Sequence, residues 1–429
     1  MTTETVWPAS IWQRYVLASE KRRPGTGTGV YFSVNAVLEF AGPLCVPTLT
    51  SAFRELVRRH ELLRTRLVVD RGSEPLQVVR SDSTSAIELV DEDDVLAAEG
   101  WSHAPVRQER SPLSARLARR GPEAHVFSLH LHHLVSDPTT LWGVLGELAA
   151  LYTAALGGAD VPPAPAQYRE YAVEELRRSG SDRDAAERWW SSAVGRARFA
   201  SVRPGPESEP FAFREEFLAP DLRAAAERLA RTYRGTLFVV LLAALACAMD
   251  PHVGDGDHLV FSTMFARRDR PRGEMPLGPC MVPAYIPVPR PTEGLSEAYA
   301  GAVRDGVLGS RRHSLLPTEA VRSMNPAFED PENIVPFFEY LPLPRPRELA
   351  FGPVKGHVVD AAGSRDTGLA RHLGIRARPA STGALVAHFS ADGRGWTAPL
   401  TREVRRALGE VIDSAARTAP SGTATADRS

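Results

Sequence analysis

One strand that runs almost directly into one helix, within residues 124–158, limits the fold more than any other stretch of the chain. In "AHVFSLHLHH", apolar side chains from Phe127 to Leu131 alternate with polar ones, the pattern of a strand with one packed face. Asp137 then suits a helix N-cap and Pro138 the first helical position. A strand that leads straight into a capped helix predicts a mixed α/β fold.

Strands and helices interleave along the rest of the chain in the same way. The other predicted helices begin at 46 and near 236, or cover 169–178, 184–194, 221–233 and 400–419. The other predicted strands are 63–69, 257–265, 371–379 and 383–393. No internal repeat is visible, so we expect α/β sandwich-like units rather than a repeat protein.

The chain is expected to form two halves, because 429 residues exceed what one hydrophobic core usually serves. The Pro-rich stretch "GGADVPPAPAQY" interrupts the periodic pattern and is the predicted connection. We therefore place an N-terminal subdomain at 1–165, a C-terminal subdomain at 166–418 and a disordered tail at 419–429.

The charge and the cysteine content limit which classes of partner and which cellular compartment we expect. The 51 basic and 52 acidic residues give a net charge of -1, so neither nucleic acid nor a membrane surface is expected as a partner. Cys45, Cys247 and Cys280 lie far apart in apolar surroundings and are interpreted as buried free thiols. The N-terminus shows no secretion signal, and the longest apolar run, 237–249, is too short to span a bilayer. We therefore expect a soluble, cytoplasmic monomer.

Two adjacent histidines at the end of the predicted strand supply what acyl transfer needs. One neutral imidazole can take a proton from an attacking amine or hydroxyl, which is worth roughly 10²- to 10⁴-fold in rate. Because neighbouring strand residues point to opposite faces, His132 and His133 are expected to have different roles. His133 continues the packed face of Leu131, which favours it as a desolvated catalytic base. His132 is expected to make fixed hydrogen bonds.

A zinc site is one alternative, because His130 and His132 share a strand face and Asp137 could be a third ligand. No nearby Cys or Glu cluster completes these three, so we expect no metal. A purely structural interpretation, a core histidine pair beside an N-cap Asp, stays open on the local sequence alone.

A series of motifs occurs in order along the chain. They are "ASIWQRYVL", "FRELVRRHELLRTRL", "HHLVSDP", "QYREYA", "TLFVVLLAALACAM", "ARRDRP" and "PLGPCMVPAYIPV". Together they resemble the condensation-domain superfamily of nonribosomal peptide synthesis, relatives of chloramphenicol acetyltransferase and of polyketide-associated acyltransferases. "HHLVSDP" resembles the HHxxxDG signature of that superfamily, and the agreement runs from about residue 8 to residue 415.

The resemblance implies two chloramphenicol acetyltransferase-like subdomains in a V, with the histidine motif beside an active-site tunnel at their junction. It implies that His133 is the catalytic histidine and that Asp137 is structural, bonded by an Arg from the second half. Arg268 in "ARRDRP" is the matching residue, with Arg267 as the alternative. No bound cofactor is implied, because the acyl donor arrives as a thioester on the phosphopantetheine arm of a carrier protein.

The chain departs from the family signature at Pro138, which stands where the signature has Gly. Proline has no backbone N–H and a fixed φ, so any stabilisation of a developing oxyanion from this position is lost. One interpretation is a suitable first helical residue after Asp137. The other is a changed donor side of the tunnel, toward an unusual acyl group or toward loss of activity.

Three hypotheses follow for the function. The first is a stand-alone condensation enzyme that meets its carrier protein in trans and joins the acyl group to an amine or alcohol, either small or carrier-bound. The second is an acyltransferase of the same fold that uses coenzyme A thioesters. The third is a non-catalytic relative that docks or recruits other enzymes; Pro138 supports it best, whereas the retained histidines, Asp137 and Arg268 speak against it.

Overall fold

The computed structural model divides the chain into two compact units, each assembled from separate segments. Unit 1 consists of Met1–Ser181, Ala266–Val282 and Arg345–Thr367, and unit 2 of Asp182–Phe265, Pro283–Pro344 and Gly368–Ser429. Within them the structure describes residues 4–22, 24–25, 27–29, 32–69, 74–81, 85–95, 97, 112–158, 160–163, 165–201, 208–269, 275–342, 345–359 and 373–419.

This division differs from the expected subdomains 1–165 and 166–418. Helix α4 (Tyr168–Ser181) belongs to unit 1, and so do two segments of the expected second half. The physical reason is that both segments complete unit 1. Segment 345–367 supplies a strand that pairs with residues 37–41, and segment 266–282 supplies Arg268, which forms an ion pair with Asp137. Residues 420–429 of the expected tail lie outside the described residues. The expected V and its tunnel stay a prediction.

The helices and strands confirm the mixed α/β class. Unit 1 contains α1 (Ile11–Arg22), α2 (Val46–Arg59), α3 (Pro138–Ala155) and α4, with 3-10 turns η1 (Glu61–Arg64) and η2 (Glu92–Asp94). Its strands are β1 (Thr5–Pro8), β2 (Ser33–Ala41), β3 (Thr65–Val68), β4 (Leu76–Val79), β5 (Ile87–Leu89), β6 (Leu113–Gly121), β7 (Ala124–His132), β12 (Glu348–Phe351) and β13 (Val354–Val359).

Unit 2 also combines helices and strands. Its helices are α5 (Arg183–Val194), α6 (Pro220–Thr232), α7 (Leu237–Met249), α8 (Glu297–Arg312), α9 (Thr318–Arg322) and α10 (Ala398–Thr418), with 3-10 turns η4 (Asp250–His252) and η5 (Pro326–Phe328). Its strands are β8 (Phe211–Leu218), β9 (His258–Ala266), β10 (Met281–Pro289), β11 (Phe337–Tyr340), β14 (Gly374–Pro379) and β15 (Leu385–Ala391). Ala266, the last residue of β9, and the first two residues of β10 belong to the segment of unit 1 that connects these two strands.

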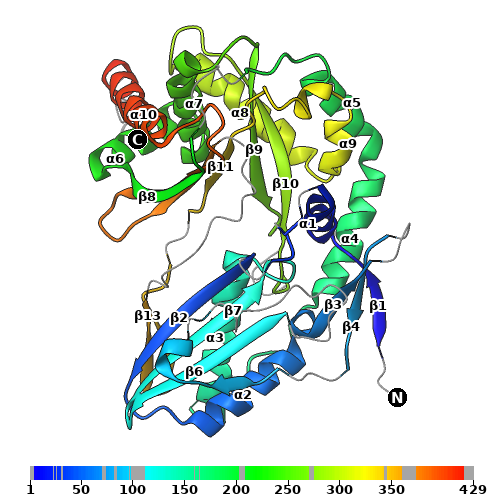
Figure 1. Cartoon of the computed structure of the whole chain (residues 1–429), viewed down its shortest axis with the longest axis vertical. Coiled ribbons are helices and arrows are strands. Elements are labelled where there is room, and N and C mark those ends of the chain that lie inside the picture. The colour runs from blue at the N-terminus through cyan, green and yellow to red at the C-terminus, as the bar shows by residue number, and fades with distance from the viewer. Residues whose placement is uncertain are drawn as a thin grey trace, which may run out of the picture. The chain divides into compact units, whose positions relative to one another are not determined.

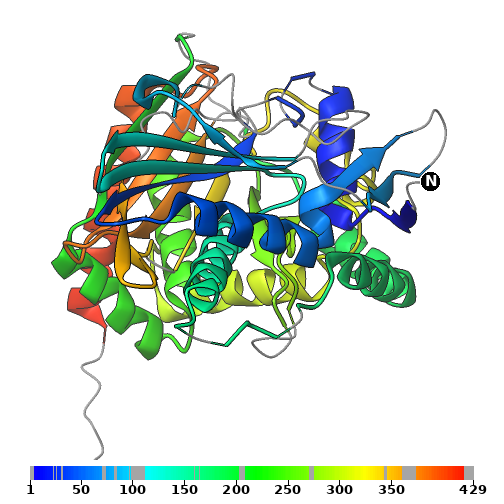
Figure 2. The same ribbon diagram turned by 90° about the horizontal axis from the view of Figure 1, so that it is seen from below.

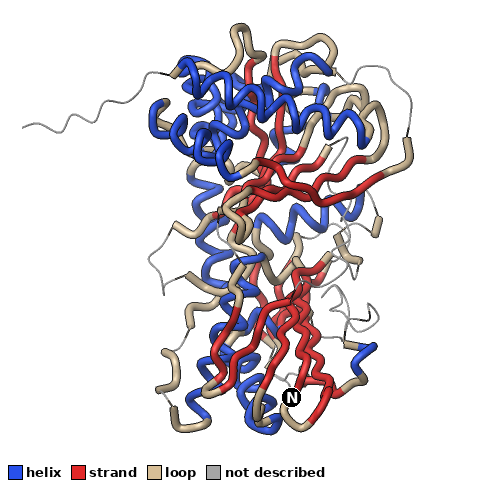
Figure 3. Tube along the Cα trace, turned by 90° about the vertical axis from the view of Figure 1, so that its left-hand side faces the viewer, coloured by secondary structure: helices blue, strands red, loops and turns tan. Residues whose placement is uncertain are grey.

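A six-stranded sheet in the order β12-β13-β2-β7-β6-β5 carries the core of unit 1, while β1, β4 and β3 form a separate small sheet. Strand β7 lies inside the larger sheet, antiparallel to β2 and β6. Helices α2 and α3 lie along one face of this sheet (Figures 1 and 2). Figure 3 shows the strands of unit 1 in red beside its helices in blue.

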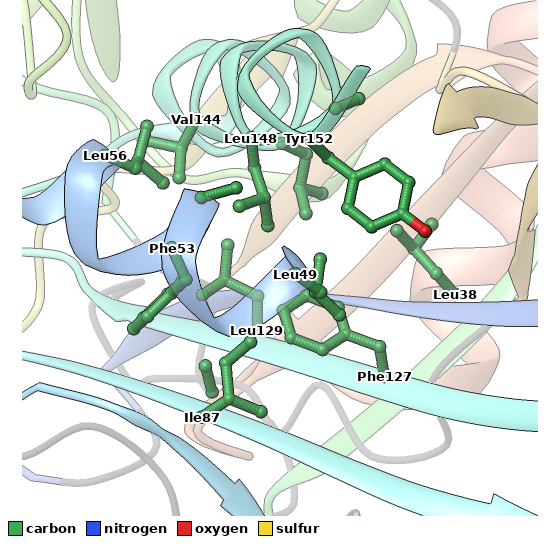
Figure 4. Close-up of a cluster of buried hydrophobic side chains, with 14 of the residues drawn as sticks. Leu38, Leu49, Phe53, Leu56, Ile87, Phe127, Leu129, Val144, Leu148 and Tyr152 are labelled. Carbon is green, nitrogen blue, oxygen red and sulfur yellow. The ribbon is translucent and has the colours of Figure 1, made fainter. Parts of the chain in front are cut away.

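The expected packed face of β7 is confirmed. Phe127, Leu129 and Leu131 belong to one buried cluster with Phe53 of α2 and Leu148 of α3 (Figure 4). Burial of each such side chain contributes about 1.5–3 kcal/mol. The strand phase of β7 is therefore fixed by the helices that cover it.

The opposite face of β7 is buried as well, although polar residues lie on it. Ser128 and His130 are fully buried, and Ser128 Oγ donates a hydrogen bond to the carbonyl of Val95 at 2.8 Å. Val90 and Val95 pack with Val126 in a small cluster on this face. The segment around η2 thus packs against the second face of the sheet at β7.

Unit 2 contains a six-stranded sheet in the order β10-β9-β11-β14-β15-β8, and helix α7 packs against α6, α8 and α10. Within the described part of the chain, no single helix is long and apolar enough to cross a membrane. Among the same described residues, one sharply bent pair, Pro220–Thr232 with Leu237–His252, reaches that length and composition when its two helices are taken together.

The cysteines match the expectation in two of three cases. Cys247 and Cys280 are buried and form no disulfide, but Cys45 is exposed. The expectation was wrong for Cys45 because this residue is the N-cap of α2 and lies outside the packed face of that helix.

Candidate active site

The histidine motif lies where β7 gives way to α3. The strand ends at His132, residues 133–135 form a turn, and Pro138 is the first residue of the helix. His133 is half-buried in this turn, whereas His132 is fully buried. The expectation that His133 continues the packed strand face is therefore wrong, because the strand has already ended and the alternation of faces with it.

The ring of His133 is held in one orientation by its own turn. Its Nδ1 lies 2.7 Å from the carbonyl oxygen of Ser136. A carbonyl oxygen can only accept a hydrogen bond, so Nδ1 carries the proton. In the neutral ring this tautomer makes Nε2 the basic nitrogen. The geometry thus sets His133 to accept a proton at Nε2.

Helix α1 fixes the backbone of the same turn. Trp12 Nε1 donates a hydrogen bond to the carbonyl of His133 at 2.7 Å, and Gln13 Nε2 donates one to the carbonyl of Leu134 at 3.1 Å. Trp12 and Gln13 are both almost fully buried. Since they are consecutive residues of one helix, a displacement of α1 would move two backbone atoms of the histidine turn together.

Aromatic rings surround the imidazole of His133. The ring of Phe32 stacks on it, with centroids 5.0 Å apart and planes at 29°, and the ring of Trp12 lies 5.3 Å away. The backbone N–H of His133 donates to the carbonyl of Phe32 at 2.9 Å. These contacts give the ring an apolar setting on two sides and leave little freedom for rotation.

His132 occupies a different environment from its neighbour. Its Nδ1 accepts a hydrogen bond from the backbone N–H of Leu134 at 3.1 Å, and its ring meets the edge of Phe32 at 5.9 Å. The hydroxyl of Ser136 donates to the carbonyl of His132 at 3.0 Å. The structure therefore places His132 as the inner support of the turn and His133 as its more accessible imidazole.

The buried Asp137 forms an ion pair with the half-buried Arg268. Arg268 Nη2 lies 2.9 Å and 2.8 Å from the two carboxylate oxygens of Asp137, and Oδ1 also accepts from the backbone N–H of Thr140 at 2.7 Å. Burial lowers the pKa of the Arg268 guanidinium, but Asp137, together with Cys280 and Tyr171, raises it overall. Asp137 is thus both the N-cap of α3 and the anchor of a segment far away in sequence.

The segment that supplies Arg268 belongs to unit 1, not to the second unit as expected. Arg267, the alternative partner, lies 3.5 Å from Asp269 through Nη2. The carbonyl of Gly278 accepts hydrogen bonds from Arg268 Nη2 at 3.0 Å and from Thr140 Oγ1 at 2.7 Å. The segment is therefore tied to the start of α3 at two points.

Pro138 is exposed and is the first residue of α3. Its fixed φ suits that position, and the N–H that it lacks would have had no partner within the helix. Local structure therefore explains why the chain tolerates proline here.

The three residues weighed as zinc ligands do not form a metal site. Among the residues that the structure describes, no group of three or more His, Cys, Asp or Glu side chains could hold a metal ion. Burial, aided by Arg116, lowers the pKa of His130 to about 3, so this ring is neutral at physiological pH.

Several residues of the site were not identified from the sequence. Trp12 and Gln13 lie in "ASIWQRYVL", a motif to which the sequence assigns no role. Thr140 and Gly278 carry no chemistry that a pattern would reveal, because they act through hydrogen bonds to Asp137 and Arg268. The motif that contains Trp12 and Gln13 is visible in the sequence, but the backbone carbonyls to which these residues donate lie 121 residues away.

Comparison with known proteins identifies one family. The family model described as Condensation domain matches residues 3–323. Tyrocidine synthase 3 of Brevibacillus parabrevis is 28% identical over 257 residues, which cover 56% of this chain and 4% of that protein. The chain spans a tenth or less of the length of the curated relatives it matches first.

Solved structures share the fold of the chain. The first condensation domain of the calcium-dependent antibiotic synthetase, in complex with substrate analogue 3a, is similar with a TM-score of 0.71 at 19% identity, over 96% of this chain and 97% of that one. The X-domain in its complex with OxyB from teicoplanin biosynthesis is similar with a TM-score of 0.75 at 18% identity, over 97% of this chain and 95% of that one. At these identities the likeness concerns the fold.

Proposed function

The chain belongs to the condensation-domain family, and from that membership we propose that it joins an acyl or aminoacyl thioester to an amine or alcohol acceptor. The thioester is carried on the phosphopantetheine arm of a carrier protein. The product is an amide or an ester of natural-product biosynthesis.

The orientation of His133 carries the proposal. Its Nδ1 proton is engaged by the carbonyl of Ser136, so Nε2 is the atom that accepts a proton from the attacking nucleophile. The nucleophile forms a bond to the thioester carbon, the carbon–sulfur bond breaks, and the proton passes from Nε2 to the departing thiolate. The imidazole is neutral again at the end, so one turnover consumes no other reagent.

The ion pair of Asp137 and Arg268 supports this chemistry at a distance. It fixes the first turn of α3 and therefore the end of the histidine turn. A bidentate or shared guanidinium–carboxylate contact restricts both side chains, which favours a preorganised site. In this proposal neither residue exchanges a proton with the substrate.

Two finer points belong to the same proposal. The carrier protein is supplied as a separate polypeptide, and coenzyme A thioesters are the alternative donors. The geometry of His133 serves either donor equally, because both present the same thioester group to Nε2.

A second candidate function is docking of another enzyme without catalysis. It is favoured by the similarity to an X-domain solved in complex with OxyB, together with Pro138 at the position of the signature Gly. The held tautomer of His133 speaks for catalysis, since a docking protein needs no oriented base.

The test compares donors and variants in one assay. Purified protein receives acyl-carrier or acyl-coenzyme A thioesters with amine and alcohol acceptors, and products are followed by mass spectrometry. We expect His133→Ala to lower the rate at least 100-fold, on the order of the contribution of a general base. His357→Ala, which removes an exposed histidine of unit 1, should leave the rate unchanged.

Other outcomes decide against the proposal. Turnover that His133→Ala leaves intact would remove His133 from the mechanism. No turnover with any donor, combined with tight binding of an oxygenase, would support docking instead.

A further inference from the structure

Helix α4 contributes a buried carboxylate that the chemistry at His133 does not use. Glu175 is 4% exposed and lies in the interior of unit 1. Its Oε2 accepts a hydrogen bond from the backbone N–H of Ile11 at 2.8 Å, and its Oε1 accepts one from the hydroxyl of Tyr171 at 2.8 Å. Two directed hydrogen bonds hold this carboxylate against the start of α1.

Ile11 is the first residue of α1, where backbone N–H groups lack partners within the helix. The Glu175 carboxylate accepts a hydrogen bond from one of these N–H groups. As a negative charge at a helix N-terminus, it also stabilises the helix by its interaction with the helix dipole. The next two residues are Trp12 and Gln13, which donate to the carbonyls of His133 and Leu134. The carboxylate is thus one residue removed from the side chains that hold the histidine turn.

A second contact from α4 strengthens the same connection. The hydroxyl of Tyr168 lies 2.8 Å from Ser10 Oγ and 3.2 Å from the carbonyl of Pro279. Ser10 Oγ in turn accepts from the backbone N–H of Gln13 at 3.3 Å. Helix α4 therefore fixes the first turn of α1 at two points and ties it to the segment that carries Arg268.

We propose that Glu175 is a positioning residue that sets the geometry of His133 through helix α1. The inference rests on the proposed function, because the turn it positions is the one to which that function assigns the base. Loss of the carboxylate frees the first turn of α1, and Trp12 and Gln13 then no longer hold the carbonyls of the turn in place.

The electrostatic surroundings make this anchor sensitive to pH. Burial raises the pKa of Glu175 to about 7, although the hydrogen bonds from Ile11 and Tyr171 oppose the rise. The groups that act on it from the packed elements are Arg14 of α1, Arg267 of the connecting segment (residues 266–282), and Tyr168 and Tyr171 of α4. Cys280 acts on Tyr171. An ionised carboxylate is the stronger acceptor, so α1 is held more firmly above pH 7 than below it.

The test reads the position of α1 directly by NMR, without any need for turnover. Protein labelled with ¹⁵N at tryptophan gives indole signals from seven residues, and Trp12→Phe assigns the signal of Trp12. Labelled histidine reports the ring of His133. We expect Glu175→Leu to shift both signals, and Glu175→Gln to shift them less, because its amide oxygen can still accept from Ile11.

The matched control is Glu174→Gln on the same helix. Glu174 pairs with Arg177 at the surface, so its variant should leave both signals in place. If Glu175→Leu does not fold, Glu175→Gln and Tyr171→Phe decide the question. Unchanged Trp12 and His133 signals in folded Glu175 variants overturn the proposal.

A pH titration supplies an independent readout. In the His133→Ala background, where residue 133 cannot titrate, the Trp12 indole signal should change with a midpoint near pH 7. The step should vanish when Glu175→Gln is added and persist when Glu174→Gln is added. A signal that is flat from pH 5 to 9, or a step that survives Glu175→Gln, contradicts the role of Glu175.

The steady-state constants kcat and KM provide the last test. Glu175→Leu should lower kcat about tenfold or more while KM changes less than about threefold, since binding is intact but the base is misplaced. Equal kcat in Glu175→Leu and wild type overturns the proposal. Absence of turnover in the wild type counts against the proposed function, and the NMR results then decide the positioning role by themselves.

Discussion

At the scale of single residues, Pro138 is the position where an effect on local stability can be measured separately from an effect on the proposed reaction. Replacing it with Gly should lower the free energy of unfolding by about 1 kcal/mol, because Gly gains freedom in the unfolded chain. The rate should stay within about threefold of the wild type if Pro138 serves only the helix. Urea unfolding and the condensation assay measure the two effects.

Pro220 offers a matched control for that experiment. It is an exposed proline in the first turn of α6, in unit 2. Pro220→Gly should cost similar stability and leave the rate unchanged. A rise of more than tenfold in Pro138→Gly alone would mean that proline restricts the approach of the donor.

The ion pair of Asp137 and Arg268 is a second residue-scale test. Arg268→Met leaves the 6%-exposed Asp137 carboxylate without its guanidinium, which should cost about 3–5 kcal/mol of unfolding free energy. Adding Asp137→Asn should recover part of that loss, because the uncompensated charge is gone. Chemical unfolding of the single and double variants gives the coupling.

Arg120 provides the comparison for this pair. It contacts Glu39 and Glu92 at the surface, and exposed pairs contribute little. Arg120→Met should therefore leave the unfolding midpoint nearly unchanged. If Arg268→Met proves equally mild, the pair does not anchor the connecting segment to α3.

At the scale of elements, Gly278 joins the connecting segment to helix α4. Its φ is 147°, and a Cβ there would lie 2.2 Å from Tyr168 Cδ2 and 2.9 Å from Leu62 Cδ2. Gly278→Ala should cost about 2–4 kcal/mol, since backbone strain and overpacking add. Differential scanning calorimetry or urea unfolding measures the loss.

Gly180 tests whether the effect is specific. It lies within α4, and nothing stands within 4 Å of an added Cβ. Gly180→Ala should be neutral or stabilise slightly, because alanine is the better helix former. Equal stability of the two alanine variants would show that residues 275–282 accommodate the Cβ added at position 278 without loss of stability.

At the scale of the whole molecule, unit 1 depends on chain segments from both halves of the sequence. Strand β13 pairs with β2 over residues 355–359, and Phe351 and Val354 join the main cluster of unit 1. A fragment of residues 1–181 lacks these strands and Arg268. It should fail to unfold cooperatively, because the edge of β2 is open and the core is incomplete.

Splitting the chain provides the control. Fragments 1–181 and 182–429, expressed together, contain every segment of unit 1. They should copurify and restore a cooperative transition measured by circular dichroism. Cooperative unfolding of fragment 1–181 alone would show that the returning segments add nothing essential.

The sequence alone determined what depends on neighbouring residues. The period of two in β7, the Asp137 cap and the proline after it lie within about fifteen residues, so each is set by local backbone preferences. Motif resemblance added Arg268 as the partner of Asp137. The α/β class followed from the order of such local elements, and the family followed from the resemblance of the ordered motifs.

Only the tertiary structure decided what depends on distant contacts. The end of β7 before His133, the hold of α1 on the histidine turn and the return of Ala266–Val282 to unit 1 rest on partners more than 100 residues apart. Such contacts form because they bury apolar surface and pair polar groups at once, a condition that no single stretch of sequence contains. The sequence could therefore indicate His133 as the proposed base, but the fold determines how its ring is held.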